Sequence, residues 1–323
     1  MNQVIIIGGG AAGIFASIGA ALQGAHVTLI ERNNRLGVKL LITGKGRCNL
    51  TNIGDIDSLV VNFPENGPFL YSAFYQFSNE DLIKLFQTLH IETKVERGGR
   101  VFPTSDKAFD IVKALASYLA RLNVNIRLNS TVDGIKIEGD KVVGVFVNHK
   151  FLKADAVIVA TGGLSYPRTG STGDGYRWAK LLGHKVEELY PSLVPLEAQE
   201  LWVKELAGLA LKNVKATAYQ NGKIAEEFGE MLFTHFGISG PIILSLSKFI
   251  VPLLKNNKIV NIEIDLKPAL SKEKLNERVK RDLQQYTNKQ LKNSLQDLLP
   301  RALILPFIQL SKIPPDKLNE RKN

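Results

Sequence analysis

Cysteine is nearly absent from this chain of 323 residues, in which Cys48 is the single example. One cysteine excludes an intramolecular disulfide and the C-x-x-C pair of dithiol–disulfide redox enzymes. It also excludes zinc sites built from several cysteines, and with five scattered histidines we expect no other metal site. These absences fit a reducing compartment, so we expect a cytoplasmic protein.

Long apolar runs are absent as well. No run approaches the ~18–20 residues that a helix needs to span a bilayer, so we expect no membrane segment. A strand pattern begins at Val4, which predicts that no signal peptide is present. With 45% hydrophobic and 22% charged residues, the composition is that of a globular protein of about two domains.

A glycine pattern opens the chain. The β-branched run Val4–Ile7 stops at glycine, and residues 14–23 follow with a helical pattern. Gly8, Gly10 and Gly13 hold the positions of a G-x-G-x-x-G motif between strand and helix. The first glycine permits the turn, the second lets a pyrophosphate approach the backbone, and the third lets the helix lie close to the strand.

An acidic residue follows at the spacing of a dinucleotide site. A second apolar strand, 26–30, ends at Glu31, 18 residues after Gly13. A carboxylate at this place accepts hydrogen bonds from the ribose 2′-hydroxyl of adenosine, and it repels a 2′-phosphate. NADP is therefore disfavoured here, although the neighbouring Arg32 keeps that alternative open. A glycine-rich turn without a ligand is the plainer alternative.

Two further stretches are expected near the same ligand. Residues 32–52 are rich in glycine, asparagine, threonine and cations, which predicts a binding loop. A later stretch, 155–163, has the pattern of a buried strand that ends in glycines. Carboxyl ends of parallel strands face the ligand crevice in open α/β sheets, so Thr161 and Gly162 are expected near the ligand. Asp174 is predicted to cap the helix that follows, and contact with the bound ligand is the alternative.

The rest of the chain predicts a change of architecture. Residues 193–267 contain short strand patterns and turns, and residues 271–299 form an amphipathic, basic helical pattern. We therefore expect an α/β fold with a Rossmann-like dinucleotide-binding domain over residues 1–190. A β-rich subdomain over 191–270 and a basic helical subdomain over 271–323 would follow it.

Positive charge is concentrated near the C-terminus. The whole chain has a net charge of +10. Residues 248–323 contain 16 Lys/Arg and 8 Asp/Glu, a net charge of +8. Such a region can bind RNA or another polyanion through counterion release, or it can be a lysine-rich solvated face. The sequence leaves both alternatives open.

Four stretches together resemble the bacterial BaiN/YhiN-like flavoproteins: Gly8–Gly13 with Glu31, Gly44–Asn52, Ala160–Gly175 and Gly229–Pro241. The resemblance covers essentially the whole chain. It implies a Rossmann-like FAD domain interrupted by a β-barrel-like subdomain and a helical subdomain. It also implies an NAD(P)/FAD-dependent oxidoreductase, with attributed activities that include double-bond reduction, amine oxidation and reduction of uridine in ribosomal RNA.

The motif positions, together with this resemblance, predict a set of cofactor-binding residues in four segments. They are Gly8, Gly10, Ala11, Ala12, Gly13, Glu31, Arg32, Lys39, Gly46, Arg47, Asn49, Thr51, Asn52, Val132, Ala160, Thr161 and Gly162. Lys39 and Arg47 would neutralise phosphate or stabilise a reduced, anionic flavin. Plain loop-stabilising and core roles remain the alternatives.

Cys48 is the candidate catalytic residue. Reduction of an activated C=C bond needs a hydride on one carbon and a proton on the other, and a thiol near the flavin would supply the proton. The alternative is a small apolar side chain packed under the loop.

The expected reaction passes hydride from NAD(P)H through FAD to an unsaturated or imine-like acceptor, which is a small molecule or a uridine in ribosomal RNA. No second G-x-G-x-x-G is present, so nicotinamide would dock transiently at the flavin. Family members add a C-terminal block that closes over the flavin, and no such block precedes Asn323. A truncated fragment without flavin or activity is therefore a further alternative.

Overall fold

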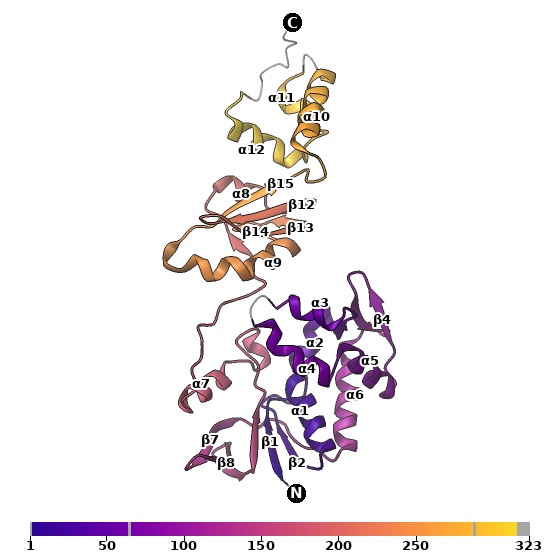
Figure 1. The fold of residues 1–323 in the computed structure, drawn as a ribbon, viewed down its shortest axis with the longest axis vertical. Coiled ribbons are helices and arrows are strands. Elements are labelled where there is room, and N and C mark those ends of the chain that lie inside the picture. The colour runs from indigo at the N-terminus through magenta and orange to yellow at the C-terminus, as the bar shows by residue number, and fades with distance from the viewer. Residues whose placement is uncertain (1, 64–65, 287–288, 315–323) are drawn as a thin grey trace. The chain divides into compact units, whose positions relative to one another are not determined.

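The computed structural model describes residues 2–63, 66–286 and 289–314 of the chain. Two compact units divide the chain, Met1–Glu187 (unit 1) and Glu188–Asn323 (unit 2) (Figure 1). Each has hydrophobic cores of its own. In the described ranges no helix is both long and apolar enough to cross a membrane. Nor do three or more His, Cys, Asp or Glu side chains in these ranges gather as a metal site.

A parallel sheet of four strands forms the centre of unit 1. In order across the sheet the strands are β10 (Ala156–Val159), β1 (Gln3–Ile7), β2 (His26–Ile30) and β6 (Asn125–Arg127). Ile7 lies opposite both Ile30 and Val159. The carboxyl ends of three strands therefore meet at one edge, and the glycine turn, Glu31 and Ala160 follow there.

Different elements cover the two faces of this sheet, because successive side chains of a strand point to opposite faces. The covering elements are α1 (Ala11–Leu22), α6 (Ala108–Arg121), β7 (Val132–Glu138), β8 (Lys141–Val147), β9 (Lys150–Lys153) and α7 (Asp174–Leu181). Ile6 packs with Ile14 and Leu115 of α1 and α6. Ile7 packs in a second core with Trp178 of α7 and with β7–β9 residues.

Short elements fill the chain between β2 and β6. They are α2 (Val38–Ile42), η1 (Thr43–Gly46), β3 (Thr51–Asn52), α3 (Ile56–Val61), η2 (Gly67–Leu70), α4 (Tyr71–Gln76), α5 (Asn79–Thr88), β4 (Thr93–Glu96) and β5 (Arg100–Pro103). The loop expected over 32–52 is thus interrupted by α2. The apolar side chains of Leu40 and Leu41 in α2 pack against the α1–α6 core. This packing stabilises a helix that is too short to be stable alone.

Unit 2 contains an antiparallel sheet of five strands. Its elements are β11 (Leu196–Glu197), α8 (Leu201–Glu205), β12 (Ala210–Tyr219), β13 (Lys223–Phe233), β14 (Gly237–Ser239), α9 (Pro241–Ile250), η4 (Val251–Asn257) and β15 (Asn261–Asp265). Tyr219 lies opposite Lys223, so Asn221-Gly222 forms the hairpin turn that its sequence predicts. Helix α9 packs its apolar residues on β13.

The helical pattern expected over 271–299 forms two helices, α10 (Lys272–Gln285) and α11 (Leu291–Ser294), and a third helix, α12 (Arg301–Ser311), follows it. Ser271 caps α10 through its side chain. Pro300 precedes the third helix, where its fixed φ suits a helix start. Buried leucine and isoleucine side chains of α12 and of the turn before it form a separate small core, and the partly buried Leu291 of α11 packs against it.

Candidate functional site

Of the three motif glycines after β1, Gly8 and Gly13 are packed against other atoms of the chain, and Gly10 is open. Gly8 has φ +109°, and a Cβ on it would lie 2.4 Å from the carbonyl oxygen of Ala160. A Cβ on Gly13 would lie 1.8 Å from the carbonyl oxygen of Gly8. A Cβ on Gly10 would meet no heavy atom within 4 Å. The fold requires the outer two glycines, whereas the middle one borders free space.

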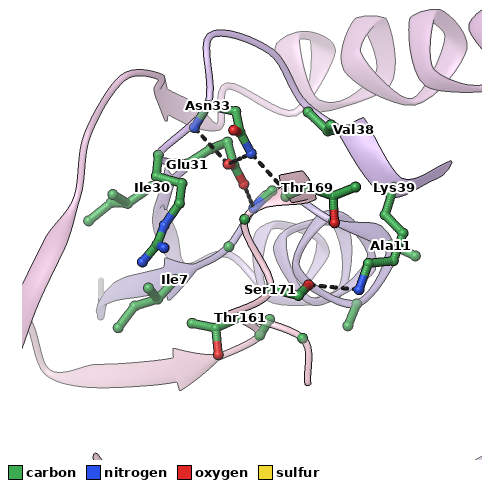
Figure 2. A pocket seen from close by; sticks show the side chains of 18 of the residues that line it. Ile7, Ala11, Ile30, Glu31, Asn33, Val38, Lys39, Thr161, Thr169 and Ser171 are labelled. Carbon is green, nitrogen blue, oxygen red and sulfur yellow. Dashed lines mark hydrogen bonds between the residues drawn. The ribbon is translucent and has the colours of Figure 1, made fainter. Parts of the chain in front are cut away.

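That free space is a pocket of about 340 Å³ at the carboxyl edge of the parallel sheet (Figure 2). Helix α1 begins here after Gly10, which has no side chain to cap the first N–H groups, and the first turn holds no acidic residue. An uncapped helix N-terminus presents N–H donors and partial positive charge to an anion. The pocket is of the size of small-ligand sites.

Glu31 provides a fixed carboxylate in this pocket (Figure 2). Its Oε2 accepts a hydrogen bond from the Gly9 backbone N–H at 2.6 Å. Its Oε1 accepts from the Asn33 backbone N–H at 2.8 Å and from Asn33 Nδ2 at 2.7 Å. Residue Glu31 is 8% exposed, and no cation in the described ranges pairs with it. These bonds use three of about four acceptor positions, so one position on Oε2 remains for a donor.

The segment 165–174 lies beside the same pocket and is hydrogen-bonded to residues that follow β2. Lys39 Nζ donates to the carbonyl oxygen of Ser165 at 2.8 Å and to Ser171 Oγ at 2.7 Å. Asn33 Nδ2 donates to the carbonyl oxygen of Thr169 at 3.1 Å. Lys39 has no carboxylate partner in the part of the chain that the structure describes, so its charge remains available to a bound anion.

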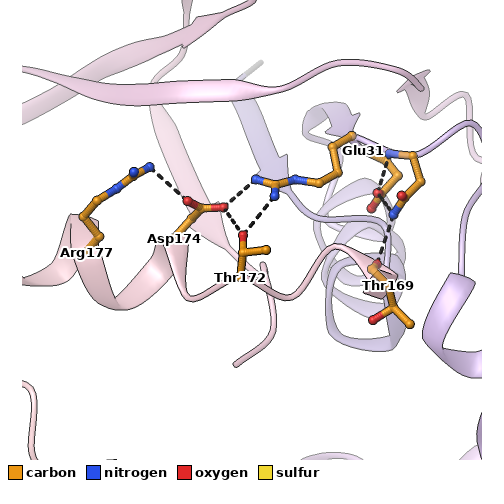
Figure 3. A network of polar contacts seen from close by, with 7 residues as sticks. Glu31, Thr169, Thr172, Asp174 and Arg177 are labelled. Carbon is orange, nitrogen blue, oxygen red and sulfur yellow. Dashed lines mark hydrogen bonds and ion pairs between the residues drawn. The ribbon is translucent and has the colours of Figure 1, made fainter. Parts of the chain in front are cut away.

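Arg32 is held by an acidic residue of this segment (Figure 3). Its guanidinium forms an ion pair with Asp174 and donates to Thr172 Oγ1 at 2.9 Å. Asp174 also accepts from Arg177 at 2.9 Å. The expectation that Asp174 caps its helix is wrong, because Gly173 holds the cap position of α7 and Asp174 is the first helical residue.

A second, apolar pocket of about 380 Å³ adjoins Ala11, Ala12 and Leu40. Cys48 and Asn49 line it together with side chains of α1, α5 and α6. Cys48 is 1% exposed, and burial raises the pKa of its thiol while a hydrogen bond with Thr43 opposes that shift. The thiol is therefore protonated at neutral pH, packed in the core that also holds Phe86.

Eleven of the predicted cofactor-binding residues line the first pocket. They are Gly8, Gly10, Ala11, Ala12, Glu31, Arg32, Lys39, Val132, Ala160, Thr161 and Gly162. Six others do not line it. Gly13 lies one turn into α1, Asn49 lines the second pocket, and Gly46, Arg47, Thr51 and Asn52 belong to the 43–52 region.

Arg47 is bound to other protein groups. Its guanidinium donates to Glu96 at 2.7 Å and to Asp106 at 3.4 Å, and it lies 4.1 Å from the centre of the Phe102 ring. Asn52 Nδ2 donates to the carbonyl oxygen of Gly98 at 2.7 Å. In this structure both side chains therefore tie the loop to the β4–β5 hairpin.

Several pocket residues escaped the sequence analysis. Asn33, Ser130, Thr169, Ser171 and Trp178 all line the first pocket. Asn33, two residues after Glu31, was within reach of sequence reasoning, since asparagine often bonds a neighbouring acceptor. The others come from segments about a hundred residues or more away, and only the fold brings them here.

The residues present fit the adenosine and pyrophosphate half of a dinucleotide. The free acceptor position of Glu31 suits a ribose hydroxyl, which donates, and it does not suit a phosphate, which only accepts. The open face of Gly10 and the uncapped start of α1 suit a pyrophosphate. Lys39 adds a positive charge at the same edge.

The chain matches a known family along nearly its whole length. Residues 2–241 match the HI0933-like protein Rossmann domain, and residues 190–322 match the HI0933-like protein barrel and H2TH domain. The chain is 31% identical to the 3-dehydro-bile acid delta(4,6)-reductase of Clostridium scindens over 315 residues, which are 97% of this chain and 76% of that protein.

It is similar to two further proteins. It shares 32% identity over 326 residues with the ribosomal RNA dihydrouridine synthase of Escherichia coli, covering 98% of this chain and 76% of that protein. A solved 3-ketosteroid delta1-dehydrogenase from Sterolibacterium denitrificans aligns with a TM-score of 0.47 and 14% identity, covering 66% of this chain and 62% of that one. The chain therefore belongs to the HI0933-like family, and its class is that of FAD-dependent oxidoreductases.

Proposed function

We propose that this FAD-dependent oxidoreductase binds the adenosine half of FAD in the pocket at the carboxyl edge of β1 and β2. One observation carries the proposal: the Glu31 carboxylate is buried, is oriented by Gly9 and Asn33, and keeps one acceptor position open. The adenosine 2′-hydroxyl would donate to that position. The pyrophosphate would lie against Gly10 and the N–H groups that begin α1.

The protein's own part in this binding is orientation and charge. Glu31 fixes the ribose, the start of α1 attracts the pyrophosphate, and Lys39 neutralises part of its charge. FAD, when bound, supplies hydride transfer to and from a substrate. The Cys48 thiol is protonated at neutral pH, which is the form that a general acid needs, but its burial equally fits a packing role.

Substitution of Glu31 tests the site. Glu31→Ala removes the ribose acceptor and leaves the Gly9 and Asn33 donors without it, so we expect FAD affinity to fall about tenfold to a hundredfold. Asp57→Ala, at an exposed position of α3, is the matched control that loses a carboxylate elsewhere. Titration of flavin absorbance and circular dichroism would follow binding and fold separately. Equal FAD affinity of Glu31→Ala and the wild type would contradict the site.

For the reaction, we propose transfer of hydride from NAD(P)H through FAD to an unsaturated acceptor. The supporting observation is the similarity to a protein named 3-dehydro-bile acid delta(4,6)-reductase. Anaerobic mixing of the FAD-loaded chain with NADH or NADPH should bleach the flavin band, and an enone should restore it. A flavin that neither nucleotide reduces would contradict this proposal.

A second candidate acceptor is uridine in ribosomal RNA. Two relatives are named ribosomal RNA dihydrouridine synthase, and residues 248–323 hold a net charge of +8. RNA binding through this region should weaken steeply as salt rises, because each neutralised phosphate releases counterions. RNA affinity that is absent, or that does not change between low and high salt, would count against the RNA acceptor.

A further inference from the structure

Arg32 lies at the position of a side chain that would bind a 2′-phosphate. It follows Glu31 directly and lines the nucleotide pocket. A guanidinium beside the adenosine ribose is the group that accommodates a 2′-phosphate in NADP-binding sites. Here, however, the guanidinium is already paired with Asp174 and donates to Thr172 Oγ1 at 2.9 Å (Figure 3).

Asp174 is itself firmly placed. Its side chain is 13% exposed and accepts from Thr172 Oγ1 at 3.0 Å and from Arg177 at 2.9 Å. As the first residue of α7, after the cap residue Gly173, it also lies at the end of the helix where a carboxylate is favoured. These contacts fix the carboxylate that holds Arg32, so the guanidinium is not free to turn to a ligand without breaking them.

We propose that Asp174 determines nucleotide specificity in this pocket by neutralising and holding Arg32. Glu31 repels a 2′-phosphate directly. Asp174 neutralises the charge of Arg32, which would otherwise offset this repulsion. Together they make the pocket select adenosine dinucleotides with a free 2′-hydroxyl over those with a 2′-phosphate. This inference rests on the proposed function, because it concerns the same adenosine site.

The test compares two ligands that differ in one phosphate. Affinities of the full chain for ADP-ribose and for 2′-phospho-ADP-ribose are measured by calorimetry, and their ratio is the readout. Asp174→Asn keeps the size of the side chain and removes its charge, so the positive charge of Arg32 is no longer neutralised. We expect the ratio to shift about tenfold toward the 2′-phosphate ligand. Arg32→Ala in the Asp174→Asn background should cancel the shift.

Two controls separate this effect from misfolding. Arg177→Ala removes the second cation that pairs with Asp174 but leaves the pair with Arg32, so its ratio should equal that of the wild type. Asp174→Glu keeps the charge and should also leave the ratio near the wild-type value. An unchanged ratio in Asp174→Asn, in a chain that still binds ADP-ribose, would overturn the inference and leave the nucleotide site standing. Failure of the wild type to bind either ligand would overturn the site and the inference together.

Discussion

The two glycines Gly10 and Gly13 should respond to the same added methyl group in opposite ways. In Gly13→Ala the new Cβ would lie 1.8 Å from the carbonyl oxygen of Gly8. Such contacts are essentially never shorter than 3.0 Å, so helix α1 must move away from β1. Overpacking of this kind costs about 3 kcal/mol. If unit 1 (Met1–Glu187) melts as one cooperative unit, that lowers its melting temperature by roughly 6–12 °C.

Gly10→Ala should instead spare the fold and harm the site. Its Cβ meets no heavy atom within 4 Å, and its φ of −80° is ordinary for alanine. The stability loss at this cap position should be about 1 kcal/mol or less. The methyl group occupies the place where the pyrophosphate approaches the backbone, so FAD affinity should fall more than about tenfold.

Thermal melting and FAD titration of both variants check this contrast. The reasoning is refuted if Gly13→Ala melts with the wild type, since the packing of α1 on β1 would then be wrong. It is equally refuted if Gly10→Ala binds FAD as tightly as the wild type, since no ligand phosphate would then lie at the glycine turn.

Two further predictions concern the region around the 43–52 loop. Burial raises the pKa of the Cys48 thiol and shields it from reagents. Iodoacetamide at pH 8 should therefore alkylate the folded chain at least about tenfold more slowly than the chain unfolded in urea. Equal alkylation rates would contradict the burial of Cys48. Lys94, and less strongly Arg47, hold the pKa of Asp106 below its usual range. The stability from these pairs is therefore present above about pH 4 and is lost as pH falls through the lower folded-state pKa of Asp106. In denaturant titrations, Asp106→Asn should lose less stability on acidification than the wild type. Parallel pH profiles of stability in the two proteins would contradict this prediction.

The sequence predicted best the features that depend on residues close to one another along the chain. The run Val4–Ile7, the spaced glycines and Glu31 lie within one strand–helix–strand unit, so their spacing alone specified the edge where they meet. The same holds for the hairpin at Asn221-Gly222, because that dipeptide supplies the backbone conformations of a tight turn. Predictions of this kind needed no knowledge of distant contacts.

Other features depend on contacts that no local pattern encodes. The pair of Arg32 with Asp174 joins residues 142 positions apart, and Lys39 reaches Ser171 across 132. Arg47 was expected at the cofactor, whereas the fold surrounds its guanidinium with Glu96, Asp106 and Phe102. A cation in a glycine-rich loop fits both roles equally well.

Two helices escaped the sequence analysis. Helix α9 buries Ile242, Leu246 and Ile250 at helical spacing, but it lies within the stretch that was assigned to short strands and turns. Helix α12 contains Pro306 within its length, and a proline inside a helical pattern usually indicates the end of a helix. Tertiary packing stabilises both helices.

The most direct test of the account is the FAD dissociation constant of the full chain, measured by flavin fluorescence for the wild type and for Glu31→Ala. The account predicts one FAD per wild-type chain and an affinity at least about tenfold weaker in the folded Glu31→Ala variant. No bound FAD in the wild type, or equal affinities in the two proteins, would contradict the assignment of the pocket at Glu31 as the adenosine site.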